Sequence, residues 1–259
     1  MSPWNPGAYL KFEDERTRPS VDLCARILAS PRSVLDVGCG PGNSTRVLRD
    51  RWPAADITGL DNSPEMIAQA RAGHPAGTWV LADAATYAPG RQFDLVFSNA
   101  VLQWLPNQEE ILPRLMGLVA AGGCLAVQVP AGGRTGFRGA LRTVAERPRW
   151  HPVLKGAGDA LRFHEPGFFY DLLAPLGARV DLWETTYFHP LAGHQAVLTW
   201  FEQTGMRPYL ERLGEADRTA FKAEVLDACR GDYPLAADGK VLLPFKRVLF
   251  VAWKGVPRT

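Results

Sequence analysis

Several features are scarce or missing in this 259-residue sequence, and each absence argues against a kind of protein. The four cysteines form no CxxC pair, which argues against a disulfide framework and a cysteine-based metal site. No apolar run approaches the roughly 18–20 residues that cross a bilayer, and no basic start followed by an apolar stretch opens the chain. We therefore expect a cytoplasmic protein with free thiols, without a membrane partner and without a metal. The cysteines are Cys24, Cys39, Cys124 and Cys229.

Neither sign of charge is in strong excess. The chain has 29 lysines and arginines against 27 aspartates and glutamates, a net charge of +2. This balance predicts neither a polyanion-binding face nor an acidic tail, so we expect no nucleic-acid partner. A hydrophobic content of 46% with 22% charged residues is typical of a folded globular chain.

Short apolar runs alternate with helical patterns from Ser33 to Val129. This alternation predicts βαβ units, and therefore a parallel sheet with helices on both faces, an α/β fold. The predicted strands are Ser33–Val37, Asp56–Leu60, Thr78–Leu81, Phe93–Ser98 and Gly123–Val129, and the predicted helices are Asn43–Arg51, Pro64–Ala72 and Gln108–Val119.

The two ends of the chain follow a different pattern. Residues 1–19 predict an extended or loosely helical arm, a lid over the site, with Pro19 in the first turn of a following helix. Residues 131–155 are rich in Gly, Arg and Pro and indicate a mobile loop or an inserted cap. We expect one domain, 1–259, with a helical cap that supplies substrate elements at 131–173 and 190–235. Further helices are predicted at 167–173, His194–Thr204 and Glu215–Cys229, and further strands at Arg179–Phe188 and Arg247–Trp253.

A glycine-rich turn follows the first predicted strand. Gly38, Gly40 and Gly42 have the spacing G-x-G-x-G, which differs from the dinucleotide pattern G-x-G-x-x-G and lacks the Lys and Ser/Thr of a P-loop. Asp36 lies two residues before the first glycine, where a carboxylate would repel a phosphate and attract an ammonium group. A turn without a ligand is the alternative.

Two more aspartates follow the next strands. Asp61 ends the second strand, where a carboxylate can accept hydrogen bonds from both ribose hydroxyls. Asp83 follows the third strand, where it can accept a hydrogen bond from an adenine amino group. Each is also a plausible turn residue. With the glycine turn they predict a nucleoside that carries a cation and no phosphates, which is S-adenosylmethionine (SAM).

These motifs resemble the class I SAM-dependent methyltransferases. The resemblance implies a Rossmann-like sheet of seven strands in the order 3-2-1-4-5-7-6, with strand 7 antiparallel. It also implies that Met66 packs on the adenine, although a core position is an equal alternative. The full predicted cofactor set is Asp36, Gly38, Gly40, Gly42, Asp61, Asn62, Met66, Asp83, Ala84 and Asn99.

The segment Phe97–Pro106 resembles two narrower groups, the trans-aconitate methyltransferases and the malonyl-thioester methyltransferases. Motifs near the two ends, such as Tyr9–Pro19, Thr185–Pro190 and Thr204–Leu210, favour the first group. The resemblance implies that trans-aconitate, a small polycarboxylic acid, is converted to its monomethyl ester. Residues 131–137 depart from the family pattern, which continues with Asp-Asn after Gln-Val-Pro.

A carboxylate nucleophile sets simple chemical requirements. Its reference pKa of about 4 leaves it ionised at neutral pH, so we expect no general base and no catalytic side chain. The other carboxylates need fixed cations, and arginine binds carboxylates with two parallel hydrogen bonds. The predicted substrate set is Tyr9, Arg16, Arg18, Gln103, Trp104, Tyr187, His189, Trp200 and Arg207. Solvated charges and core aromatics are the alternatives for these residues.

Two other functions remain open at this point. One is methyl transfer to a malonyl-thioester or another small molecule, and the other is SAM binding without catalysis. A nucleic-acid methyltransferase is disfavoured, because Ser98-Asn99-Ala100-Val101 stands where such enzymes hold a flipped base.

Overall fold

The computed structural model describes residues 13–132, 136–202 and 204–255. They form two compact units. The sheet unit comprises residues 14–130, 163–185 and the chain from Arg247 onward, and the helical unit comprises mainly residues 131–162 and 186–246. Residues 163–173, which we expected in the cap, belong to the sheet unit. Residues 1–12 of the predicted arm lie outside the described residues, and the rest of the arm, up to residue 19, belongs to α2.

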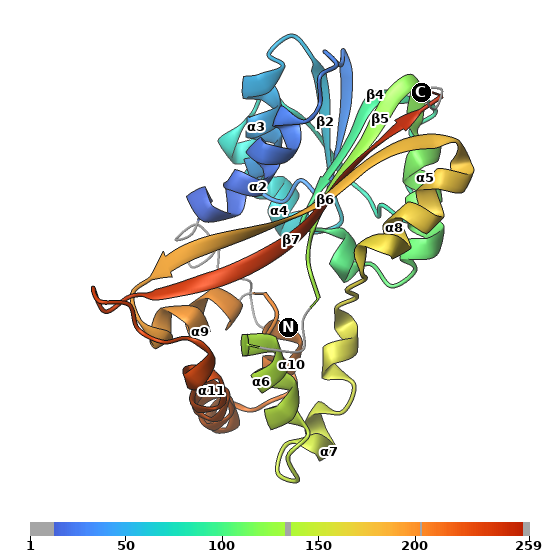
Figure 1. Cartoon of the computed structure of the whole chain (residues 1–259). Helices are drawn as coiled ribbons and strands as arrows, with labels where there is room; N and C mark the ends of the chain where they lie inside the picture. Colours follow the sequence, from blue (N-terminus) through green and yellow to red (C-terminus); the bar gives the residue numbers. More distant parts are fainter. Residues whose placement is uncertain (1–12, 133–135, 203, 256–259) are drawn as a thin grey trace. The chain divides into compact units, whose positions relative to one another are not determined.

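Seven strands form one sheet in the order β3-β2-β1-β4-β5-β7-β6, with β5 and β7 antiparallel (Figure 1). Strands β1 to β5 pair in parallel with their neighbours. The predicted strand order and the antiparallel strand are therefore confirmed. The bounds are β1 Ser33–Val37, β2 Asp56–Asp61, β3 Thr78–Leu81, β4 Phe93–Asn99, β5 Val119–Pro130, β6 Ala178–Leu191 and β7 Val241–Lys254.

Helices cover both faces of the sheet unit (Figure 1). Because side chains alternate along a strand, Val34, Leu95 and Phe97 share one face, where they pack with Leu23 of α2 and Leu48 of α3. Helices α5 and α8 pack together on the other face, where Phe169 meets Phe250 of β7 at 5.3 Å. The bounds are α2 Glu13–Ala25, α3 Asn43–Arg51, α4 Pro64–Gly73, α5 Gln108–Gly117 and α8 Pro166–Leu173, with 3₁₀ turns η1 Leu102–Trp104 and η3 Ala174–Leu176.

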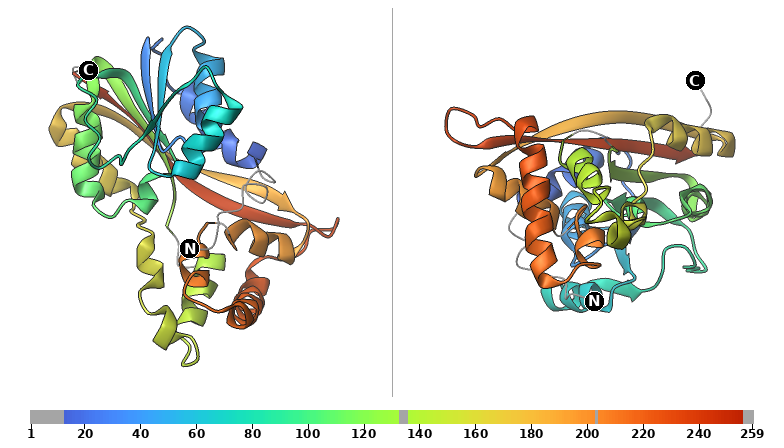
Figure 2. Two further views of the ribbon diagram at one scale, coloured as in Figure 1. Left: turned by 180° about the vertical axis from the view of Figure 1, so that it is seen from behind. Right: turned by 90° about the horizontal axis from the view of Figure 1, so that it is seen from below.

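The helical unit has its own aromatic core. Phe137 of α6 stacks on Phe201 of α9 at 4.1 Å. Trp150 meets Phe221 of α11 edge-on at 5.3 Å, and its Nε1 donates to Glu224 Oε2 at 3.0 Å. Helices α6 and α11 lie side by side (Figure 2). The bounds are α6 Gly136–Ala145, α7 His151–Leu154, α9 His194–Glu202, α10 Arg207–Leu210 and α11 Glu215–Cys229, with η2 Ala157–Ala160 and η4 Arg230–Asp232.

Two local predictions need correction. Pro19 lies inside α2 rather than in its first turn, because the helix begins at Glu13, and packing of Leu23 and Cys24 on the sheet stabilises the helix despite the proline. Part of the segment predicted as a mobile loop or an inserted cap is helical in α6 and α7, which fits the predicted helical cap and makes the loop alternative wrong there. Its Gly- and Arg-rich composition hid the buried positions Phe137 and Val144, which have helical spacing.

None of the helices in the described part of the chain is long and apolar enough to cross a membrane.

Candidate active site

The glycine turn joins β1 to α3 in a conformation that needs glycine. Gly38, Gly40 and Gly42 have φ angles of 71°, 55° and 102°, values that L side chains rarely adopt. A Cβ at Gly38 would overlap the side chain of Val101, so the turn after β4 packs directly on the glycine turn. A Cβ at Gly40 would meet nothing within 4 Å. The backbone at Gly40 is therefore open to a close approach by a ligand.

Asp36 lies beneath this turn with no exposed surface. Its Oδ2 accepts hydrogen bonds from the hydroxyls of Ser44 at 2.7 Å and Thr45 at 2.6 Å, which fixes the start of α3. Its Oδ1 is buried without a hydrogen-bond partner among the described residues. Burial raises the pKa of Asp36 to about 6, although the two hydroxyl bonds act in the opposite direction. One acceptor oxygen is thus left for an ammonium group.

We predict a pH dependence of stability from Asp36. Its folded pKa of about 6 exceeds the ordinary 3.8, so its contribution is fully present below 3.8 and is lost as pH rises through 6. The difference corresponds to about 3 kcal/mol. Asp36→Asn should remove this decline from the free energy of unfolding between pH 4 and pH 7, measured by urea denaturation without ligand. Asp50→Asn, at an exposed position of α3, should keep the wild-type profile, and an unchanged profile in Asp36→Asn would refute the prediction.

Asp61 connects the end of β2 to the glycine turn. Its Oδ2 accepts from the Gly40 N–H at 2.9 Å, and its Oδ1 accepts from the Ser63 N–H at 2.9 Å. Ser63 in turn caps α4 by accepting from the Met66 N–H at 3.3 Å. Asp61 therefore stabilises the turn after β2, as the alternative reading of the sequence predicted. Each of its carboxylate oxygens still has a further acceptor site for a ligand. Met66 is half-buried and Asn62 is exposed.

Asp83 is exposed and organises the turn after β3. Its Oδ1 accepts from the Ala85 N–H at 2.8 Å, and Ala84 beside it is half-buried. Asn99 is the last residue of β4, and its Oδ1 is buried without a partner in the described chain.

The turn after β4 carries backbone strain at this same edge. Ala100 has a φ of 57°, the one positive φ recorded for a residue other than glycine in the described ranges. Gln103 Nε2 donates to the Ala100 carbonyl at 2.6 Å, while Gln103 Oε1 is buried without a described partner. Trp104 is 39% exposed. The sheet unit thus brings Gln103 and Trp104 to the edge that carries the glycine turn.

The predicted arm residues are only partly described. Tyr9 lies outside the described residues, and Arg16 falls in α2 with its side chain also outside them. Arg18 is an exposed residue of α2.

The other predicted substrate residues belong to the helical unit. His189 of β6 stacks on Trp200 of α9 at 4.7 Å and on Tyr187 at 6.4 Å, and all three are buried. Arg207 Nε donates to Glu211 Oε1 at 2.8 Å. The three rings therefore pack against one another in the core of this unit. The Arg207 guanidinium uses its Nε in the ion pair with Glu211.

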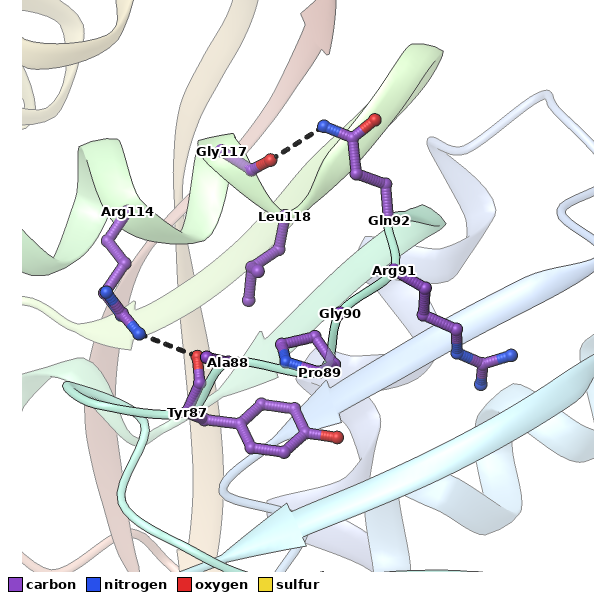
Figure 3. Close-up of a pocket in the computed structure, with 9 residues that line it drawn as sticks. All are labelled: Tyr87, Ala88, Pro89, Gly90, Arg91, Gln92, Arg114, Gly117 and Leu118. Carbon is purple, nitrogen blue, oxygen red and sulfur yellow. Dashed lines mark hydrogen bonds between the residues drawn. The ribbon is translucent and has the colours of Figure 1, made fainter.

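A shallow pocket of 590 Å³ lies elsewhere in the sheet unit, between the chain before β4 and the end of α5 (Figure 3). Arg114 Nη2 donates to the Tyr87 carbonyl at 2.8 Å, and Gln92 Nε2 donates to the Gly117 carbonyl at 3.0 Å. It lies at the amino end of β4, whereas ligands of parallel sheets bind at the carboxyl ends. We assign no function to this pocket.

Sequence reasoning missed a set of buried polar side chains in the sheet unit. Gln128, in the otherwise apolar end of β5, is 1% exposed, and neither amide atom has a partner in the described chain. Thr17 Oγ1 and Ser20 Oγ of α2 are also buried without one. Arg247 of β7 is 5% exposed. In the sequence, the signal for this set was Gln128, a polar residue within the apolar run of β5.

The chain matches known methyltransferases over nearly its whole length. Residues 34–123 match the family described as Methyltransferase domain. The chain is 46% identical to a trans-aconitate 2-methyltransferase of Methylobacterium radiotolerans over 98% of this chain and 99% of the relative. It is 45% identical to the Klebsiella pneumoniae trans-aconitate 2-methyltransferase, with the same two shares. The chain belongs to the trans-aconitate 2-methyltransferase family.

The fold has relatives beyond this family. YcgJ from Bacillus subtilis superposes with a TM-score of 0.60 at 13% identity, over 93% of this chain and 100% of that chain. At that identity the likeness concerns the fold alone.

Members of this family take their methyl group from SAM, which is the cofactor of this chain. The edge described above suits that nucleoside. The backbone at Gly40 is open, Asp61 keeps acceptor sites for ribose hydroxyls, and the buried Asp36 Oδ1 suits an ammonium group.

Proposed function

We propose that this protein transfers the methyl group of SAM to one carboxylate of trans-aconitate and releases the monomethyl ester. The observation that carries the proposal is the 46% identity to a trans-aconitate 2-methyltransferase over 98% of this chain and 99% of the relative. Such near-complete coverage includes the elements after Pro130 as well as the glycine turn. We further propose a cytoplasmic location.

The chain's part in this reaction is binding, alignment and exclusion of water. SAM, when bound, supplies an electrophilic methyl carbon on a sulfonium sulfur. The acid is already ionised at neutral pH, so no side chain has to remove a proton. Correct alignment of two reactants can contribute roughly 7–11 kcal/mol to catalysis in favourable cases. A rigid edge supports such alignment, and the contact between Gly38 and Val101 ties the two turns of this edge together.

Each element of that edge has a proposed role. Asp61 binds the ribose, Asp83 with Ala84 lies at the adenine, and Met66 packs on its ring. Gln103 and Trp104 line the path of the methyl group. Arg16, Arg18 and Arg207, with Tyr9, Tyr187, His189 and Trp200, remain candidates for the substrate pocket.

A methyl-transfer assay tests the proposal. With labelled SAM and equal concentrations of trans-aconitate, cis-aconitate, isocitrate and a malonyl-thioester, we expect a monomethyl ester mainly from trans-aconitate, identified by mass spectrometry. Preference for the thioester would move the chain to the other carboxylate methyltransferase group. S-adenosylhomocysteine (SAH) binding without any ester would indicate a binding module.

A further inference from the structure

Polar side chains gather on one face of the sheet unit, and three of them, Asp36, Asn99 and Gln128, carry atoms without a hydrogen-bond partner in the described chain. The register pairs Asp36 with Phe97, Asn99 with Gln128, and Pro130 with Arg247. Because strand side chains alternate, Asp36, Asn99 and Gln128 point to the same face as Phe97. Arg247 shares the face of Leu249 and Val251, which pack with Phe97. All four side chains therefore lie on the face that α2 covers.

Helix α2 adds two more groups to this face. Leu23 and Cys24 of α2 pack on the sheet, and Ser20 and Thr17 continue the same helical stripe toward the N-terminus. Ser20 is 1% exposed, and neither hydroxyl has a hydrogen-bond partner in the part of the chain that the structure describes. Buried polar groups are almost always hydrogen-bonded in native proteins. A group of unsatisfied ones on a single face therefore indicates a ligand.

The chemistry of the set changes across the sheet. On β1 and β4 the unsatisfied atoms are acceptors, Asp36 Oδ1 and Asn99 Oδ1, which suit an ammonium group. On β5 the Gln128 amide brings an unsatisfied Nε2 donor, and on β7 Arg247 brings a buried positive charge. Arg247 and Gln128 are diagonal neighbours, about 7–8 Å apart at the backbone and within reach of long side chains. The Gln128 amide and the Arg247 guanidinium therefore suit an anion.

We propose that Gln128 and Arg247, with the hydroxyls of Ser20 and Thr17, bind a carboxylate that does not react, the anchoring carboxylate of the acid substrate. The inference rests on the proposed function. In the sheet, β5 is two places and β7 three places from β1, which carries the glycine turn, at about 4.8 Å per strand. The anion site is therefore displaced from the turn toward the side of β4 and β5. That displacement favours the substrate over the carboxylate of SAM itself.

Gln128→Met tests this assignment, since methionine fills a similar volume without amide atoms. Calorimetric titration of trans-aconitate into the protein–SAH complex should show a dissociation constant raised at least about tenfold. Arg247→Met should raise it by more, because a hydrogen bond to a charged donor is stronger. SAH affinity should stay within about twofold of wild type in both variants.

Thermal unfolding without ligand separates binding from a structural role. Gln128→Met should keep or raise the melting temperature, because it removes two buried polar atoms that lack partners. Matched controls are Gln92→Met, whose amide donates to Gly117 at the other end of β4, and Arg179→Met, whose guanidinium stacks on Trp253 at 4.0 Å. Neither control should change the affinity for trans-aconitate.

Substrate variation gives a second, independent readout. Wild type should discriminate trans-aconitate from the three dicarboxylates that each lack one of its carboxylates. In Gln128→Met and Arg247→Met, the preference over one of these dicarboxylates should shrink, which identifies the anchoring carboxylate.

The outcomes distinguish this inference from the proposed function. Wild-type methylation of trans-aconitate with unchanged affinities in both variants would overturn the anion site and leave the function standing. Trans-aconitate binding that depends on Gln128 and Arg247, without any methyl transfer, would support the anion site and overturn the proposed function. A marked loss of SAH affinity, or a lower melting temperature in Gln128→Met, would also overturn the assignment.

Discussion

Asp61→Ala should lower the affinity for SAH at least about a hundredfold. The carboxylate accepts from the Gly40 and Ser63 N–H groups in the protein itself, and we propose that its remaining acceptor sites bind both ribose hydroxyls. Hydrogen bonds to a charged group contribute roughly 1.5–3 kcal/mol each, and 1.4 kcal/mol corresponds to a factor of ten. Loss of two such bonds to the ligand, together with a loosened glycine turn, gives the stated magnitude.

Isothermal titration calorimetry with SAH measures this effect. Asp56→Ala is the matched control, because Asp56 begins the same strand and forms an exposed ion pair with Arg91 at 2.9 Å. The control should bind SAH like wild type. If Asp61→Ala also binds SAH within a few-fold of wild type, Asp61 is only a turn residue, the alternative that its sequence context left open.

Gly38→Ala is expected to cost about 2–5 kcal/mol of stability and to abolish methyl transfer. A left-handed conformation costs a non-glycine residue roughly 1–2 kcal/mol, and Gly38 has a φ of 71°. The new methyl group would also overlap Val101, and such overpacking typically costs about 1–3 kcal/mol. The displaced turn would carry Gln103 and Trp104 with it, because these residues belong to the 3₁₀ turn η1 that Val101 precedes.

The double variant Gly38→Ala, Val101→Ala separates the two causes. Removal of the overlap should restore part of the stability in urea denaturation and leave the backbone cost. Gly117→Ala, at a position where a Cβ meets nothing within 4 Å, should leave both stability and activity close to wild type. Wild-type activity in Gly38→Ala would contradict the tight packing of the two turns.

Local patterns were sufficient for the part of the site that lies at strand ends. The helix Asn43–Arg51 and the strand Thr78–Leu81 have the predicted bounds. Asp36 and Asp61 lie in β1 and β2, and Asp83 lies two residues after the end of β3. Carboxyl ends of parallel strands meet at one edge, so sequence position alone places these residues together. The α/β fold class therefore followed from short segments, whereas the reaction class was implied by the family resemblance that these segments carry.

Tertiary packing decided what local patterns could not. Pro19 lies within α2 because a buried stripe outweighs local propensity, and His189 and Trp200 form a buried stack where sequence indicated only a candidate pocket. Gln128 and Arg247 lie more than a hundred residues apart in the chain. Their common face depends on the β5–β7 register, and a shift of one residue would turn either side chain to the opposite face. Pairing between distant strands is a long-range property, so the proposed anion site exists only in the folded sheet.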